Sequence, residues 1–313
     1  MKLALTLGFS ILISQIGFSQ KILTDEYEQK ITLNDFRLKG KVKKVISTAT
    51  DSNGNSATLP LYENEYYDQV SLEFNEKGLL DKRVNYLDYR GKLGVYNYVD
   101  YVYKTSYLLD NQFNTIVNNG EDPKRVASNK SYYYDNKNQL IKLIDKVEGR
   151  SSKSTYETNF IYSSRLDKIV TKVENSILTE NNLTYNKNGF LVLNESTSFD
   201  GKKGRKSYYL YDNKTPIYKE EIAGSLSSIT FYDKGSISKI QSFDTDKNLN
   251  YEALYNSNNE IESLKTQSFI GGKSTLTNYK ITYDYDEKGN WIKAKIISNG
   301  VSKFNVNRSI SYF

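Results

Sequence analysis

A short phrase recurs seven times along this chain and constrains its fold more than any other feature. Each copy has an aromatic residue, then Asp or Asn, two polar residues, usually Gly or Asn, and an apolar residue two places on. The copies are FNEKGLL (74–80), YDNKNQL (134–140), YNKNGFL (185–191), YDNKTPI (211–217), YDKGSI (232–237), YNSNNEI (255–261) and YDEKGNW (285–291). With a weaker copy at Tyr162, the phrase returns about every 25 residues, which is the length of two strands and their connections.

The phrase has the chemistry of a hairpin turn. Asp or Asn at its start can accept a hydrogen bond from the backbone two residues on, which favours a type I turn. The fourth turn position then needs a positive φ, and a one-residue bulge follows it. Aliphatic residues three apart after the turn, such as Leu140 and Leu143, fit a strand that is re-aimed by this bulge. The positions predicted to carry the turns are Gly78, Asn138, Gly189, Asn259 and Gly289.

These turns predict an all-β, single-domain array of antiparallel hairpins over residues 38–313, curled, spiralling or closed. A single hairpin cannot bury its own face, so about nine or ten of them must pair side by side. Residues 20–37 lack the phrase, and we expect them to form an N-terminal cap.

Residues 1–19 have the composition of a secretory signal peptide, with one lysine, an apolar run and small residues near the end. We therefore expect export and a secreted, periplasmic or cell-surface location. The chain has no cysteine, so it has neither a lipid-attachment cysteine nor disulfides. Its net charge of +6 is interspersed along the chain, which predicts no nucleic-acid partner.

The last strand, FNVNRSISYF, invites comparison with an outer-membrane barrel. Counted back from Phe313, the side chains in phase would be Ser311, Ser309, Asn307 and Asn305, so lipid would meet no apolar group. On this ground the mature chain is predicted not to be membrane-spanning.

The copy built from Tyr285, Asp286, Gly289, Trp291 and Ala294 resembles the YD repeat of Rhs-type proteins, and the resemblance covers about residues 74 to 295. It implies a long antiparallel sheet that curls as hairpins are added, sometimes into a hollow shell, on exported proteins. The chain is similar to the small exported bacterial members. It has no toxin domain or autoproteolytic aspartyl motif of the large Rhs shells, which argues against an encapsulated cargo.

The chain contains no histidine and no cysteine, which removes Ser-His and Cys-His catalysis and thiolate or imidazole metal sites. We therefore predict no cofactor and no catalytic residues, and a non-enzymatic protein. A carboxylate-dependent carbohydrate-active enzyme stays an alternative, because it needs only two acids at a suitable distance. The nearest metal signal is a weak calcium candidate at Asp244, Asp246 and Asn248.

The 28 tyrosines indicate what the sheet could bind. Aromatic rings on an exposed face can stack on sugars, whereas in the alternative interpretation they are cross-strand packing partners. The predicted function is a binding or structural module of the cell envelope or extracellular space, with polysaccharide or another envelope protein as partner. A small Rhs-related component of a toxin system is a further alternative. The aromatic residues expected to face a ligand are Tyr96, Tyr98, Tyr133, Tyr209 and Tyr283.

Overall fold

The computed structural model describes residues 29–59, 67–104, 107–117, 125–149, 152–198, 203–212, 215–224, 226–270 and 273–313. The predicted signal peptide lies outside the described residues. Among the described residues, no helix has the length and apolar character that a membrane span requires.

One short 3-10 helix precedes the strands: η2 spans Leu33–Phe36. The strands are β1 (Val42–Asp51), β2 (Ser56–Ala57), β3 (Gln69–Phe74), β4 (Leu80–Tyr89), β5 (Lys92–Lys104), β6 (Leu108–Ile116), β7 (Arg125–Tyr134), β8 (Leu140–Glu148), β9 (Lys153–Tyr162), β10 (Leu166–Val173), β11 (Ser176–Tyr185), β12 (Leu191–Ser198), β13 (Lys203–Asp212), β14 (Thr215–Ala223), β15 (Leu226–Asp233), β16 (Ser236–Phe243), β17 (Leu249–Tyr255), β18 (Ile261–Ile270), β19 (Lys273–Tyr285), β20 (Trp291–Ser298) and β21 (Val301–Tyr312).

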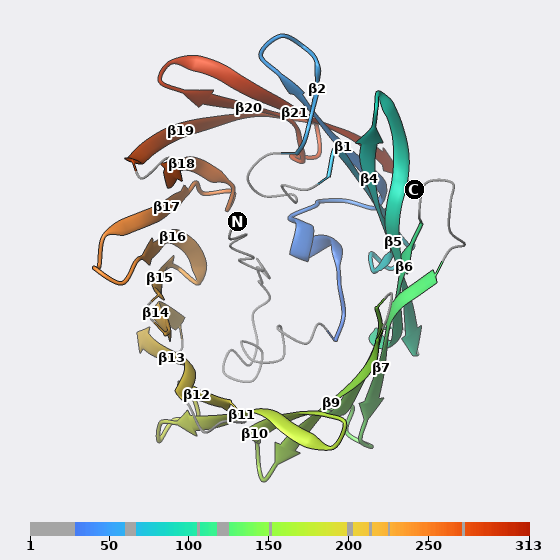
Figure 1. Ribbon diagram of the computed structural model, residues 1–313, viewed down its shortest axis with the longest axis vertical. Coiled ribbons are helices and arrows are strands. Elements are labelled where there is room, and N and C mark those ends of the chain that lie inside the picture. Colours follow the sequence, from blue (N-terminus) through green and yellow to red (C-terminus); the bar gives the residue numbers. More distant parts are fainter. Residues whose placement is uncertain are drawn as a thin grey trace.

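The strands close into a single barrel (Figure 1). From β3 to β21 every strand pairs antiparallel with the next one in the sequence, and β1 pairs with both β21 and β3. Twenty strands therefore form a ring, while the short β2 pairs only with the end of β1. The predicted all-β antiparallel sheet is confirmed, in its closed form.

A bulge recurs at the aromatic residue of the hairpins. At the β7–β8 turn, Tyr133 pairs with Lys142 and Tyr134 pairs with Leu140, so Ile141 has no partner. The same shift occurs beside Tyr185, Tyr255 and Tyr285. The extra residue brings Leu140 and Leu143 to the same face, which explains the spacing of three in the sequence.

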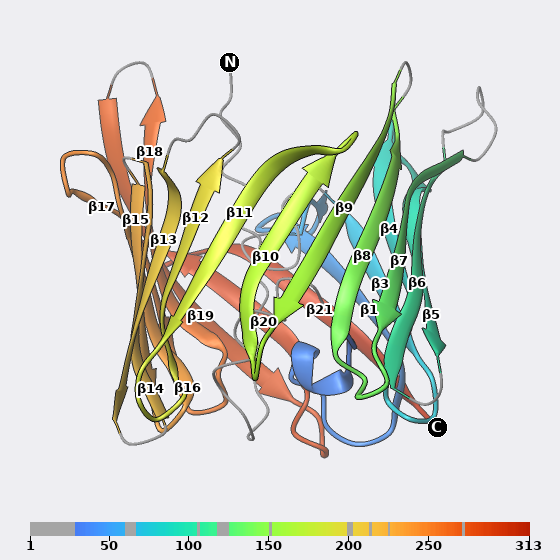
Figure 2. The same cartoon turned by 90° about the horizontal axis from the view of Figure 1, so that it is seen from below.

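The strands are tilted, and their connections form two rims (Figure 2). The turns that follow odd-numbered strands from β3 onward lie at one end, which we call the turn rim. The helix η2 lies at this end, inside the ring of strands (Figures 1 and 2). We call residues 29–41 the strap, because they run inside the barrel along the turn rim.

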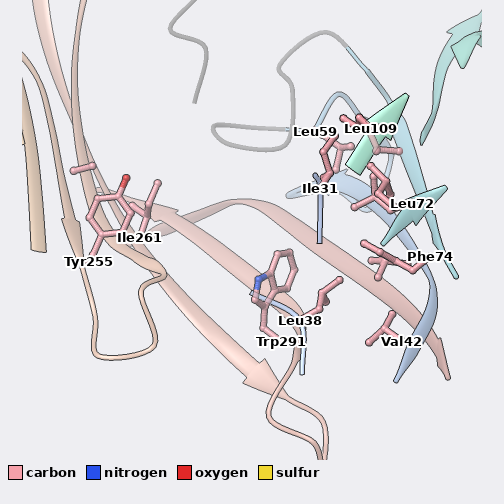
Figure 3. Packing of buried hydrophobic residues seen from close by; sticks show 14 of the residues in the cluster. Ile31, Leu38, Val42, Leu59, Leu72, Phe74, Leu109, Tyr255, Ile261 and Trp291 are labelled. Atoms are coloured by element: carbon pink, nitrogen blue, oxygen red, sulfur yellow. The ribbon is translucent and has the colours of Figure 1, made fainter. Parts of the chain in front are cut away.

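The hydrophobic core lies on the inner face of the wall close to the turn rim. Figure 3 shows Ile31 and Leu38 of the strap with Phe74 and Trp291 of the wall on the inner side of the sheet. A barrel of this strand number is too wide for its own inward side chains to fill, so the strap supplies apolar contacts that the wall alone lacks. Wall residues with almost no exposed surface are Leu80, Leu109, Leu140, Leu166, Leu191, Leu264 and Ile296.

The closed ring corrects one step of the sequence argument. An outer-membrane barrel was rejected because the outward register of the last strand is polar. The register of β21 against β1 places Ser311, Ser309, Asn307 and Asn305 opposite Lys44, Ile46, Thr48 and Thr50, on the face away from the core. The predicted polar face is therefore present, and it lies on a closed barrel, because ladder hydrogen bonds close the sheet whatever its outer side chains are.

Candidate functional site

The turn rim is built by one repeated hydrogen-bond pattern. In the turn of β7 and β8, the Asp135 carboxylate accepts from the backbone N–H of Lys137 at 2.8 Å and of Gln139 at 2.8 Å. The same two bonds are accepted by Asn75, Asn186, Asn256 and Asp286 in their own turns. The fourth residues have positive φ throughout: Gly78 75°, Asn138 61°, Gly189 83°, Asn259 66° and Gly289 77°.

Several tyrosines at or near the aromatic position of the repeat join a hairpin to the preceding one, although the buried Tyr211 and Tyr255 hydroxyls form no such bond. The Tyr162 hydroxyl donates to the Leu140 carbonyl at 3.1 Å, and Leu140 is the first residue of the preceding outgoing strand. These carbonyls lie where neighbouring hairpins diverge and the strand pairing between them has ended. The tyrosine hydroxyl therefore supplies the hydrogen-bond donor that a paired strand would otherwise supply. The equivalent bonds are Tyr103 to Leu80 at 2.8 Å, Tyr134 to Leu109 at 2.9 Å, Tyr185 to Leu166 at 2.5 Å and Tyr283 to Ile261 at 2.7 Å.

The strap is bound to the first hairpins mainly through its backbone. The N–H of Leu33 donates to the Gly78 carbonyl at 3.0 Å, and the N–H of Leu80 donates to the Ile31 carbonyl at 2.9 Å. The Phe36 ring packs edge-on against Phe74 at 5.6 Å between centroids. The strap therefore satisfies backbone groups at the turn rim while its apolar side chains join the core.

On the other side, the strap is held by a buried ion pair. Arg37 lies 3.1 Å from the Glu260 carboxylate, and the two side chains are 20% and 7% exposed. The Arg37 guanidinium also lies over the Tyr255 ring, 5.7 Å from its centroid. Burial raises the pKa of Glu260, although Arg37 opposes the shift. Such a pair fixes the position of the strap against the wall, because moving Arg37 away from Glu260 would leave a buried charge without a partner.

A second polar contact fixes the end of the strap. The Asn290 side chain is 2% exposed, accepts from the Lys39 N–H at 2.6 Å and donates to the Lys39 carbonyl at 2.9 Å. It also donates to the Tyr312 hydroxyl at 2.8 Å, and that hydroxyl donates to Asp286. One asparagine thus connects the strap, the last strand and the last turn of the rim.

Farther from the turn rim, the inner face changes from apolar to polar side chains. Asn85 donates to Asn97 at 2.9 Å, and Asn97 donates to Asn114 at 3.0 Å, which forms an amide ladder across β4, β5 and β6. The hydroxyls of Thr158 and Thr171 lie 3.1 Å apart. These groups satisfy one another, so they form a polar layer of the wall.

The outer face carries cross-strand ion pairs. Lys44 and Glu73 are direct partners across β1 and β3, and their charged atoms lie 2.8 Å apart. A bilayer against this wall would have to accommodate these charges, at a cost of about 2–4 kcal/mol for each lysine at its midplane. Further outward pairs are Lys82–Asp100 at 3.0 Å, Lys142–Glu157 at 3.2 Å, Lys168–Glu180 at 2.7 Å, Lys206–Glu195 at 2.6 Å and Lys265–Glu252 at 2.7 Å.

The five tyrosines expected to face a ligand do not lie together. Tyr98 and Tyr133 are on the outer face, where Lys82 lies 4.3 Å from the Tyr98 centroid and Tyr133 is 46% exposed. Tyr96 is half-buried, and its ring lies 6.0 Å from that of Tyr67. Tyr209 is buried, and Tyr283 packs against Trp291 at 5.8 Å, because the strand alternation turns both toward the core. These two therefore belong to the inner wall.

The calcium candidate lies at the rim opposite the turn rim. Asp244 accepts from the N–H groups of Asp246 at 2.9 Å and Asn248 at 2.8 Å, as the opening residue does in the other turns. The Asn248 backbone N–H lowers the pKa of Asp244. Within the described chain, no three Asp or Glu side chains form a group that could hold a metal ion.

Sequence reasoning did not find Arg37, Glu260 and Asn290. Arg37 lies in the predicted cap and Glu260 in a turn, 223 residues apart. A single sequence contains no signal that pairs them. A signal did exist for the tyrosine bonds, since the aromatic position of the repeat is almost always Tyr rather than Phe, which indicates a use for the hydroxyl.

Comparisons with known proteins give only distant structural similarity. No known protein family matches the sequence, and no curated protein matches it. Similar solved structures include a porin-like protein from Bacteroides uniformis, with 12% identity over 86% of this chain and 96% of that chain and a TM-score of 0.38. A porin-like protein from Bacteroides vulgatus has 9% identity over 87% and 98%, with a TM-score of 0.27. The Tc holotoxin pore of Photorhabdus luminescens has 12% identity over 76% of this chain and 19% of that chain, with a TM-score of 0.26.

The prediction that the mature chain is not membrane-spanning is therefore wrong. It rested on the polar side chains that the last strand would turn toward lipid. The chain instead forms a closed antiparallel barrel with an even number of strands, which is the architecture by which bacterial outer-membrane proteins cross a bilayer.

Proposed function

We propose that this protein is a non-catalytic β-barrel of the cell envelope that binds polysaccharide through tyrosines on its outer face. The observation that carries the proposal is that some tyrosines lie on the inner face of the barrel wall and others lie on its outer face. Tyr162 and Tyr185 of the repeat face inward and are hydrogen-bonded to carbonyls, whereas the partly exposed Tyr98 and the 46% exposed Tyr133 face outward. Exposed aromatic rings flanked by polar groups are suited to stack on sugar rings.

The non-catalytic part of the proposal is supported by the inward carboxylates. A glycosidase of the usual kind needs two free acids across a cleft. The register turns Asp145 and Glu221 toward the interior, where Asp145 accepts from Ser128 at 2.8 Å and Glu221 lies 3.1 Å from Lys219. Glu260 is held by Arg37. These three acids are thus engaged in holding the wall or the strap.

Binding is tested with the purified mature protein and a panel of insoluble polysaccharides. We expect retention on at least one of them, and about tenfold weaker binding when Tyr98 and Tyr133 are both changed to alanine, because a stacked ring contributes on the order of 1 kcal/mol. The matched control is Ile161→Ala, an outward side chain that is 47% exposed and has no aromatic ring. Failure to bind any polysaccharide in the panel would overturn the carbohydrate part of the proposal.

The envelope location is tested separately by fractionating cells that express the full chain. We expect the protein in the envelope or the medium with its first residues removed. Alkaline washing of the membrane fraction then distinguishes a barrel inserted in the bilayer from one attached to its surface. Recovery of the uncleaved chain in the cytosol would refute the envelope assignment.

A further inference from the structure

The outer face of β19 to β21 differs from the rest of the wall. On several other strands, outward lysines such as Lys142 and Lys206 are paired with carboxylates. Lys280, Lys293 and Lys295 form no ion pair with any residue that the structure describes, although Asp284 lies opposite Lys293 in the ladder. No described carboxylate therefore lies within ion-pair distance of these three ammonium groups.

These lysines share one surface with amide side chains. Lys293 and Lys295 are two residues apart on β20, so they project on the same face roughly 7 Å from each other. Lys280 is diagonal to Lys295 across β19 and β20, because Thr282 is the direct partner of Lys295. On β21 the opposite residues are Asn307 and Asn305. We call Lys280, Lys293, Lys295, Asn305 and Asn307 the lysine face.

A groove adjoins this face at the turn rim. The pairing of β18 with β19 ends at Ser263 and Lys280, whereas β19 continues to Tyr285 and pairs there only with β20. The two hairpins diverge, and the groove between them is bridged by a hydrogen bond of 3.3 Å from the Asn258 amide to the Tyr285 hydroxyl. Its polar lining includes Asn256, Asn258, Ser263, Lys280, Thr282 and Tyr285.

The chemistry of the groove is that of a sugar site with an anionic component. Amide and hydroxyl groups match the hydroxyls of a sugar, and Tyr285, which is 37% exposed, offers a ring for stacking. Lys280 belongs both to the groove and to the lysine face. A polysaccharide chain that extends out of the groove would therefore contact the ammonium groups of the lysine face next. Glu262 is the one acid that lines the groove, on the side that belongs to β18.

We propose that the groove and the lysine face form one binding site for an acidic polysaccharide. Its sugars would bind between Asn258 and Tyr285, and its carboxylate or sulfate groups would bind Lys280, Lys293 and Lys295. The inference rests on the proposed carbohydrate-binding function and adds a second site, on β18 to β21, with the class of ligand that it would take. An anionic lipid surface is disfavoured, because the hydrogen-bonding groups line a recess between two hairpins, where a flat surface would not reach them.

The test measures binding of the mature protein to alginate, dextran sulfate and neutral dextran, and to vesicles of anionic phospholipid. We expect both acidic polymers to bind more tightly than neutral dextran, with affinity that falls as salt rises. Changing Lys280, Lys293 and Lys295 together to glutamine should weaken acidic-polymer binding about tenfold. The matched control removes three exposed lysines from the opposite wall, Lys137, Lys146 and Lys187, and should bind like the wild type. Thermal unfolding of both triple variants checks that each is folded.

The outcomes separate this inference from the function on which it rests. Equal binding of neutral and acidic polymers, unchanged in the Lys280, Lys293 and Lys295 variant, refutes the acidic site and leaves carbohydrate binding standing. Equal weakening by the two triple variants shows a general charge effect and also refutes the site. Binding of vesicles without binding of polysaccharide refutes both in favour of a lipid surface. No binding of any probe refutes both.

Discussion

Two parts of the wall are made from hairpins with the same bulge but differ in how well their side chains are buried. In β20, which lies beside the strap, Ala294 and Ile296 have no exposed surface. In β16, on the far wall, Ser242 is the one buried residue of eight, and the inward Ile240 is only half-buried. Both hairpins carry the bulge at the aromatic position. The bulge therefore shapes both parts of the wall, whereas the burial of the inward side chains depends on what lies beside them inside the barrel.

The strap accounts for this difference. Its Leu38 is 5% exposed within the core that contains Trp291 and Ile296. Arg37 and Lys39 attach it to the turns of β17–β18 and β19–β20. The wall beside the strap thus has a second layer, while the far wall depends more on strand pairing.

The largest expected effect compares two inward isoleucines, one on each part of the wall. Ile296→Ala should lower the free energy of unfolding by about 2–5 kcal/mol, since it opens a cavity in a buried core. Ile240→Ala should lower it by about 1–2 kcal/mol, because part of that side chain is already in water. Denaturant unfolding measures both. Equal losses would show that the strap gives the neighbouring wall no added burial.

The second comparison removes an arginine from each part. Arg37→Ala leaves the Glu260 carboxylate buried without its partner, so we expect a loss of about 2–3 kcal/mol, somewhat below the value for fully buried pairs. Arg205→Ala, whose side chain is 53% exposed and 3.6 Å from Glu221, should cost less than about 1 kcal/mol. Denaturant unfolding gives both values, and limited proteolysis should show earlier cleavage near the strap only in the Arg37 variant. A strap that stays equally protected would contradict this role.

The local structure of the barrel could be predicted from the sequence. The Asp or Asn at each turn start and the Gly or Asn three places on determine a backbone conformation that few other residues favour, so Gly189 and Asn259 identify their turns without any knowledge of the fold. The spacing of three between Leu140 and Leu143 likewise predicted the bulge, which also depends only on neighbouring residues.

Closure and the strap could not be predicted in the same way. Closure depends on the pairing of β1 with β21, which joins residues such as Val45 and Ile310 that no local rule relates. The sequence therefore left the sheet curled, spiralling or closed, and the polar outer face of β21 argued only against contact with lipid. The tyrosines predicted to face a ligand show the same limit. Tyr133 lies on the outer face of the wall, whereas the alternation of side chains along β13 places Tyr209 on the inner face.

The third comparison removes single hydroxyls from the tyrosine bonds. Tyr162→Phe loses one hydrogen bond to Leu140 and should cost about 1 kcal/mol. Tyr103→Phe should cost slightly more, because its hydroxyl lies 2.8 Å from the Leu80 carbonyl and 3.4 Å from that of Ile31 in the strap. Thermal and denaturant unfolding measure the losses. If both variants unfold like the wild type, the phenols act in the wall by ring packing alone.

The smallest effect is a pH dependence that differs between the two rims. Because burial raises the pKa of Glu260 above its ordinary value of 4.5, the folded protein keeps that proton at a pH where the unfolded chain has lost it. The stability that this carboxyl contributes is therefore fully present below pH 4.5 and is lost as the pH rises through the raised pKa. Relative to Glu260→Gln, the wild type should lose less than about 1 kcal/mol over this range.

Asp244 provides the control of opposite sign. Its pKa is lowered from 3.8 by the Asn248 backbone N–H, so its contribution is present above pH 3.8 and is lost as the pH falls through the lowered value. Relative to Asp244→Asn, the wild type should thus weaken in acid, whereas relative to Glu260→Gln it should weaken as the pH rises above 4.5. Unfolding curves from pH 3 to 8 for the three proteins test both slopes. Parallel curves for the wild type and Glu260→Gln would mean that water reaches Glu260, so that it titrates like an exposed acid. In that case packing, rather than a buried charge, would hold Arg37 in place.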